Sequence, residues 1–189
     1  MYTDIYDDAM WLINLVENLL SVSRLEEGRM NLHVSTELID EVVAEALRHI
    51  NRKSVEYHLN VQNSEEYLLA QIDAKLIVQV LINIVDNAIK YTPPGSEINI
   101  GWQRKGDSIY ISIADNGPGI PDQAKPHIFD MFYTASNQIA DSRRSMGLGL
   151  ALCKSIVNAH GGEITVADHL PHGSIFTFSV PAGEVELHE

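Results

Sequence analysis

Residues 83–91 of the 189-residue chain read Asn83-Ile84-Val85-Asp86-Asn87-Ala88-Ile89-Lys90-Tyr91. They lie in a longer predicted helix, from Asp73 to about Tyr91, which Pro93-Pro94-Gly95 ends. At about 100° per residue, Asn83, Asn87 and Lys90 fall within roughly 60° of one another on one face of this helix. A different, apolar face carries Ile77, Leu81, Ile84, Val85 and Ala88.

The polar face departs from the usual composition of a helix. Asparagine is unfavourable inside a helix because its side chain competes for backbone hydrogen bonds, and coordinated departures of this kind tend to mark function. An amide oxygen is a hard ligand that suits Mg²⁺, and a lysine can attract phosphate as a point charge. The pattern alone fits a solvated helix face equally well.

A glycine-rich turn follows a predicted strand and reads Asp115-Asn116-Gly117-Pro118-Gly119-Ile120. Glycines two residues apart let the backbone turn tightly and approach a flat ligand. An ionised aspartate only accepts hydrogen bonds, so Asp115 can take the exocyclic amino hydrogen of adenine. A β-turn with a capping aspartate is the alternative interpretation.

A second glycine pair, Gly147-Leu148-Gly149-Leu150, opens a predicted helix that runs to His160. Glycines at a helix N-terminus expose backbone N–H groups to an anion. Taken alone, the motif is more often a packing pair of glycines. A weaker signal is Gly173-Ser174, at the entry to the last predicted strand.

Outside these motifs, the pattern predicts an α+β fold. The strands are mostly hairpin-linked and the helices do not alternate regularly with them, which favours a mixed sheet with helices on one face. Residues 121–146 show little periodicity, which is typical of a functional or mobile segment. The remaining predicted helices cover 4–27 and 37–49, and the predicted strands lie near 31–35, 55–61, 67–72, 98–102, 109–113, 163–168 and 174–180.

The first predicted helix carries a heptad-like apolar seam and ends at Gly28. A helix of this length with an apolar stripe needs a partner, either a second helix in a hairpin or bundle, or the domain that follows. The seam residues are Ile5, Ala9, Leu12, Val16, Leu19 and Val22.

The net charge of −13 argues against broad nucleic-acid binding, since phosphate backbones require a basic face. It leaves ATP open, because a few local donors and a metal can override the global charge. The single cysteine, Cys153, excludes an intrachain disulfide and is expected to be buried on a helix in a protein of a reducing compartment. With neither a run of 18 apolar residues nor an apolar leader, the sequence predicts no membrane span and no signal peptide.

Together these motifs resemble the N, G1, F and G2 boxes of sensor histidine kinases, with Ile128-Phe129-x-x-Phe132 as the F box. Those kinases belong to the ATPase superfamily of gyrase B, Hsp90 and MutL. The resemblance covers about residues 70–181, and Leu19–Glu26 looks like the end of a second dimerisation helix. Within the family, residues 115–164 are most similar to the potassium-responsive sensor kinases.

The resemblance implies a two-layer α/β sandwich, the Bergerat-type ATP-binding fold, preceded by a long dimerisation helix. It divides the chain into 1–29, part of the dimerisation region, 30–182, the catalytic domain, and 183–189, a tail. Its expected ligands are ATP and Mg²⁺, with Asn87 on the metal and Asn83 and Lys90 as catalytic residues at the phosphates. The other residues expected to bind the nucleotide are Tyr91, Asp115, Gly117, Gly119, Ile120, Phe132, Gly147, Leu148, Gly149, Leu150 and Ser174.

The resemblance also implies a lid over about 121–146, anchored by Phe129 and Phe132. Arg143 and Arg144 within it would be able to reach the γ-phosphate. Two features depart from the family pattern. Ser145 stands where many kinases have an earlier glycine, and none of the eight histidines is followed by an acidic residue and then a proline, as the family's phosphate-accepting histidine is.

The sequence is therefore interpreted as a fragment of a longer kinase. It is expected to transfer the γ-phosphoryl group to a histidine on the dimerisation domain of the same or a partner chain, for relay to a response regulator. The full-length protein is expected to be a membrane-associated homodimer with this domain in the cytoplasm.

Two alternatives remain at this point. One is an ATP hydrolase of the same superfamily, but those enzymes carry a glutamate where Asn83 stands, and an amide cannot take a proton from water at neutral pH. The other is a non-catalytic module that binds nucleotide or a partner helix.

Overall fold

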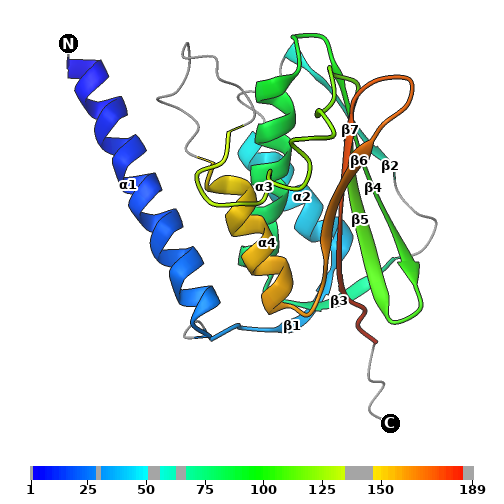
Figure 1. Ribbon diagram of the computed structural model, residues 1–189. Coiled ribbons are helices and arrows are strands. Elements are labelled where there is room, and N and C mark those ends of the chain that lie inside the picture. Colours follow the sequence, from blue (N-terminus) through cyan, green and yellow to red (C-terminus); the bar gives the residue numbers. More distant parts are fainter. Residues whose placement is uncertain (1, 29–30, 51–55, 63–66, 135–146, 185–189) are drawn as a thin grey trace.

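The computed structural model describes residues 2–28, 31–50, 56–62, 67–134 and 147–184, and it shows a mixed sheet with helices on one face (Figure 1). The five-stranded sheet has the order β2-β4-β5-β7-β6, with a parallel pair β2/β4 and antiparallel pairs elsewhere. Its strands are β2 (His58–Gln62), β4 (Glu97–Lys105), β5 (Ser108–Asp115), β6 (Ile164–Asp168) and β7 (Ser174–Pro181). The predicted two-layer α+β sandwich is confirmed.

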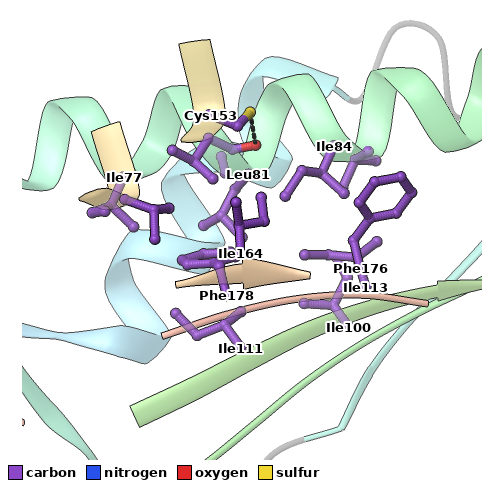
Figure 2. Packing of buried hydrophobic residues seen from close by; sticks show 14 of the residues in the cluster. Ile77, Leu81, Ile84, Ile100, Ile111, Ile113, Cys153, Ile164, Phe176 and Phe178 are labelled. Carbon is purple, nitrogen blue, oxygen red and sulfur yellow. Dashed lines mark hydrogen bonds between the residues drawn. The ribbon is translucent and has the colours of Figure 1, made fainter. Parts of the chain in front are cut away.

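Three helices cover one face of this sheet: α2 (Ile39–Ile50), α3 (Ala74–Tyr91) and α4 (Gly149–Ala159). The side chains of α3 that the sequence assigned to its apolar face are buried, and Figure 2 shows Ile77, Leu81 and Ile84 facing sheet residues. On the sheet side, alternate residues of β5 point inward, so Ile109, Ile111 and Ile113 are all buried. Burial of each such side chain stabilises the fold by roughly 1.5–3 kcal/mol.

A second, two-stranded sheet joins β1 (Ser35–Leu38) to β3 (Leu69–Ile72). The predicted strand near 31–35 is wrong in position, because pairing of Ser35 with Ile72 and of Leu38 with Leu69 sets where the strand lies. Such pairing is non-local, and the local pattern of apolar residues does not contain it. The last described residues also pair with β3, since the Gly183 N–H donates to the Leu69 carbonyl at 2.7 Å.

The helices α3 and α4 are linked at one end by a buried histidine. The Asp73 N–H donates to His160 Nε2 at 3.0 Å, and His160 Nδ1 lies 2.7 Å from the Ile156 carbonyl oxygen. Because Nε2 accepts, the proton of the neutral ring is on Nδ1, which donates to that carbonyl. The Asp73 carboxylate in turn caps α3 by accepting from the Leu76 N–H and also accepts from the His33 N–H.

The first helix, α1 (Tyr2–Glu26), packs on the domain only near its C-terminal end, where Val22 is buried and Leu25 is partly buried. Figure 1 shows α1 running alongside the helical layer. The rest of the apolar seam is exposed, with Ile5 at 60% and Val16 at 52%. The last turns of α1 thus pack on the domain that follows. Packing of the rest of α1 in a helical bundle stays a prediction. Within the described residues, no helix combines the length and apolarity that crossing a membrane requires.

Cys153 is fully buried on α4, as predicted, with its Sγ 3.7 Å from the Val80 carbonyl oxygen (Figure 2). Burial raises the pKa of its thiol to about 12 from an ordinary value of 9.0. The thiolate at pH 8 is then roughly a thousandfold rarer than for an unburied thiol.

We expect the Cys153 thiol of the folded chain to resist alkylation at pH 8 and that of the chain in guanidinium to be labelled fully, measured by mass spectrometry. Equal labelling rates in both states would contradict this environment for the thiol.

Candidate functional site

The predicted motifs meet around one cavity of about 720 Å³. Its wall is made by the polar face of α3, the turn after β5, the segment before α4, the start of α4 and one side of α1. The predicted site residues in this wall are Asn83, Asn87, Lys90, Tyr91, Asp115, Gly119, Ile120, Gly147, Leu148, Gly149, Leu150 and Ser174. Two predicted residues, Gly117 and Phe132, are not part of it.

Other residues of the cavity wall were not predicted from the sequence. One face of α1 contributes Trp11, Leu15 and Asn18, which are spaced four and three residues apart. This periodicity is visible in the sequence, but it does not say that the face borders a cavity. Gln79 and Thr92, at the two ends of the polar face of α3, were also missed.

The two asparagines of α3 differ in what holds them. Asn83 Oδ1 accepts from Gln79 Nε2 at 3.1 Å, and Asn83 Nδ2 donates to the Gly149 carbonyl at 3.4 Å. The half-buried side chain of Asn87 makes no hydrogen bond with the described part of the chain. Its amide oxygen therefore suits a hard cation shared with a ligand, which fits the expected Mg²⁺. No group of three or more His, Cys, Asp or Glu side chains in the described ranges could hold a metal ion by itself.

Lys90 lies at the rim of the cavity and is exposed. Its Nζ is 5.2 Å from the centroid of the Tyr91 ring, within the range of a cation–π interaction. The ring thus places a positive charge beside the amides of α3, where an anionic ligand would meet it.

Asp115 ends β5 as a buried carboxylate, and its two oxygens are in different situations. Oδ1 accepts from the Gly117 N–H at 2.9 Å and from the Ser174 N–H at 3.3 Å. Oδ2 has no hydrogen-bond partner among the described residues. The fold therefore fixes one oxygen and leaves the other able to accept from a ligand. Ser174, a weak signal in the sequence, acts here through its backbone N–H.

The glycines of the site divide into two kinds. A Cβ at Gly117 would lie 2.4 Å from Thr92 Cγ2, and a Cβ at Gly147, whose φ is 64°, would lie 2.4 Å from the Tyr133 carbonyl oxygen. Neighbouring atoms thus require glycine at both positions. At Gly149, however, the nearest atom to an added Cβ is Asn83 Cγ at 3.9 Å, an ordinary contact.

The helix α4 starts at Gly149 with no side-chain cap on its first N–H groups. Leu148 occupies the N-cap position and has no side chain able to accept a hydrogen bond, and the first turn carries no acidic residue. Bare N–H groups and the positive end of the helix dipole favour an anion at this point of the cavity wall.

Within the segment from 121 to 134, the predicted anchoring is confirmed for Phe129 and wrong for Phe132. Phe129 packs edge-on against Phe176, with ring centroids 6.2 Å apart, and Ile128 is buried. Phe132 is instead 57% exposed at a φ of 65°, with its N–H donating to the Gly147 carbonyl. Its predicted anchoring role is wrong, because the turn that joins Gly147 directs the ring outward. Arg143, Arg144 and Ser145 lie outside the described residues.

Lys125 ties the start of this segment to the end of β6. Its Nζ lies 2.5 Å from Asp122 Oδ1 and 2.8 Å from Asp168 Oδ1. The hydrogen bonds to these carboxylates, that to Asp122 first, raise the pKa of the lysine. The segment is thus held at two points, by this pair of contacts and by the Phe129 ring.

Comparisons with known proteins agree with this geometry. A model of the family described as "Histidine kinase-, DNA gyrase B-, and HSP90-like ATPase" matches residues 72–184. The sensor protein KdpD of Clostridium acetobutylicum is 43% identical over 177 residues, which is 94% of this chain and 20% of that protein. The chain therefore spans about a fifth of the length of this curated relative. The predicted similarity to potassium-responsive sensor kinases is confirmed.

Two solved structures have the same fold. The nucleotide-free catalytic domain of the histidine kinase ThkA matches with a TM-score of 0.65 at 29% identity, over 80% of this chain and 96% of that one. Full-length ShkA, in complex with AMPPNP, matches with a TM-score of 0.75 at 24% identity, over 94% of this chain and 37% of that one.

The two kinds of glycine predict opposite responses to alanine. We expect Gly147→Ala to destabilise the chain by about 2 kcal/mol or more, because a positive φ and a backbone clash both oppose the added Cβ. Gly149→Ala is expected to change the free energy of unfolding by less than about 1 kcal/mol. Urea denaturation followed by circular dichroism measures both, and equal losses would contradict the assigned packing.

Proposed function

The chain belongs to the family of histidine kinase-, DNA gyrase B- and HSP90-like ATPases, and from this membership we propose that it is the ATP-binding catalytic domain of a sensor histidine kinase. In this proposal it transfers the γ-phosphoryl group of ATP to a histidine on a dimerisation domain, from which a response regulator takes it. The observation that carries the proposal is the meeting of three features on one cavity: the half-satisfied carboxylate of Asp115, the amide face of α3 and the bare N-terminus of α4.

Each feature suits a different part of the nucleotide. Asp115 Oδ2 would accept the exocyclic amino hydrogen of adenine, while Oδ1 stays bound to the Gly117 and Ser174 N–H groups. Lys90 and the first N–H groups of α4 would meet the phosphates. Asn87 would hold Mg²⁺, which when bound neutralises charge on the transferring phosphoryl group. Catalysis would then consist of positioning and charge stabilisation.

The surroundings of Asn83 favour transfer over hydrolysis. The Gln79 and Gly149 contacts already use its Oδ1 and its Nδ2. An amide in this state neither removes a proton from water nor orients it as a carboxylate would. In the proposal, the nucleophile is the acceptor histidine, supplied by the dimerisation domain of the same or a partner chain.

The exposed seam of α1 supports the proposed partner. Its apolar residues recur every three or four positions and stay uncovered along most of the helix, as expected for a helix that joins a bundle. The relative from Clostridium acetobutylicum, KdpD, is a sensor protein. We therefore extend the proposal to a membrane-associated homodimer with this domain on the cytoplasmic side.

Asn87→Ala tests the metal site. We expect at least a tenfold loss of ATP affinity in the presence of Mg²⁺, about 1.4 kcal/mol, and little change in EDTA. Stability should be unchanged, because the side chain makes no hydrogen bond within the described chain. Titration calorimetry measures the affinity, with Asn158→Ala on the exposed side of α4 as the matched control. An equal loss with and without Mg²⁺ would refute metal binding by Asn87.

Phosphoryl transfer is tested by mixing the chain with a separately produced helical domain that carries the acceptor histidine. We expect acid-labile, base-stable label from γ-labelled ATP on that domain, and no label on this chain alone. Steady release of phosphate by this chain without the partner would instead indicate the hydrolase. Binding of Mg-ATP with no label at saturation would indicate a non-catalytic module.

A further inference from the structure

Two histidines of the loop between β6 and β7 contact the turn that carries Asp115. His169 Nδ1 lies 2.8 Å from the Asp115 carbonyl oxygen. His172 Nδ1 lies 2.7 Å from the Asn116 carbonyl oxygen and 3.3 Å from that of Gly117. Three consecutive carbonyls of the turn therefore face imidazoles from one loop.

The two histidines hold the turn beyond the point where the pairing of β5 with β7 ends. The antiparallel ladder between β5 and β7 ends at the pair Ala114 and Ile175, so the Asp115 carbonyl lies past its last rung. On the opposite side of the turn, β4 still holds Asn116, whose N–H donates to the Glu97 carbonyl and whose Oδ1 accepts from the Glu97 N–H. The turn is thus held by β4 on one side and by the two imidazoles on the other.

The backbone of the β6–β7 loop has a geometry that lets it lie close to the turn that carries Asp115. The His169 N–H donates to the Gly173 carbonyl at 3.0 Å, which closes the loop on itself. A Cβ at Gly173, whose φ is 127°, would lie 1.9 Å from the Asp115 carbonyl oxygen, so only glycine lets the two backbones come this close. The next residue, Ser174, donates its N–H to the Asp115 carboxylate.

The chemistry of these contacts determines which ring nitrogen of each histidine carries a proton. A carbonyl oxygen only accepts, so each Nδ1 carries a proton and donates it. The neutral ring in this tautomer and the imidazolium ion both keep that proton. The donors therefore persist whichever charge state the rings adopt.

We propose that His169 and His172 are positioning residues for recognition of the nucleotide base. Neither belongs to the cavity wall, so they act through Asp115, whose backbone they hold so that Oδ2 faces the base. The inference rests on the proposed function, since it requires that Asp115 reads adenine. It assigns the β6–β7 loop a part in selecting adenine over guanine, which carries an oxygen where adenine carries its 6-amino group.

The test compares a ligand with a base and a ligand without one. Dissociation constants of Mg-ATP, Mg-GTP and Mg-tripolyphosphate are measured for the wild-type chain and for the double variant His169→Leu/His172→Leu. We expect ATP affinity to fall about tenfold, the preference for ATP over GTP to shrink by the same factor, and tripolyphosphate affinity to stay within about twofold.

Conservative variants separate positioning from packing. In His169→Asn/His172→Asn, the Asn Nδ2 stands the same number of bonds from Cβ as the histidine Nδ1, and we expect it to restore ATP affinity to within about threefold. His58→Leu, an exposed histidine of β2, is the matched control and should leave all three constants unchanged. If the leucine variant does not fold, ¹⁵N spectra of the wild-type imidazoles decide, with a protonated Nδ1 expected on both rings.

Several results overturn the inference alone: equal losses for ATP and tripolyphosphate, unchanged ATP affinity, absence of rescue by asparagine, or an unprotonated Nδ1 on either ring. A wild-type chain that binds ATP no better than tripolyphosphate would overturn the proposed function, and this inference with it.

Discussion

The packing of α3 against α4 on the sheet is the constraint on which the site depends. The two helices run in opposite directions and are joined along their length, by His160 and Asp73 at one end, by Cys153 and Val80 in the middle, and by Asn83 and Gly149 at the cavity. Because the carboxyl end of α3 lies beside the amino end of α4, amides and a lysine of one helix face bare N–H groups of the other. The favourable opposition of helix dipoles adds to this arrangement.

Polar groups of the site bond to the described chain only in part, and the remaining acceptors are open to a ligand. The fold gives Asp115 two N–H donors on one oxygen and none from the described chain on the other, and it leaves the Asn87 amide without a partner there. Both acceptors are therefore available to a ligand that donates a hydrogen bond or brings a cation, as the proposed function requires.

The glycines of the site also divide into those that the fold requires and one that it does not. Close neighbours demand glycine at Gly117, Gly147 and Gly173, where each serves the shape of a turn. At Gly149 the surroundings would accept a methyl group, so the fold alone does not explain why the residue is glycine. The proposed function supplies a reason, since it brings a phosphate close to the backbone at the start of α4. Identical residues in the motifs thus carry different physical requirements.

The sequence by itself determined the helices and the faces of α3, because the periodicity of apolar residues is local and the polar face follows from its spacing. Most of the site residues that its motifs predicted do lie in the cavity wall, since each motif shows which backbone groups and side chains are available to a ligand. Only the tertiary structure decided that β2 runs parallel to β4, that Phe132 faces outward, that α1 borders the cavity, and that His169 and His172 hold the Asp115 turn. Each of these depends on contacts between segments far apart in the chain, whose energies outweigh local preference and leave no mark in the local pattern.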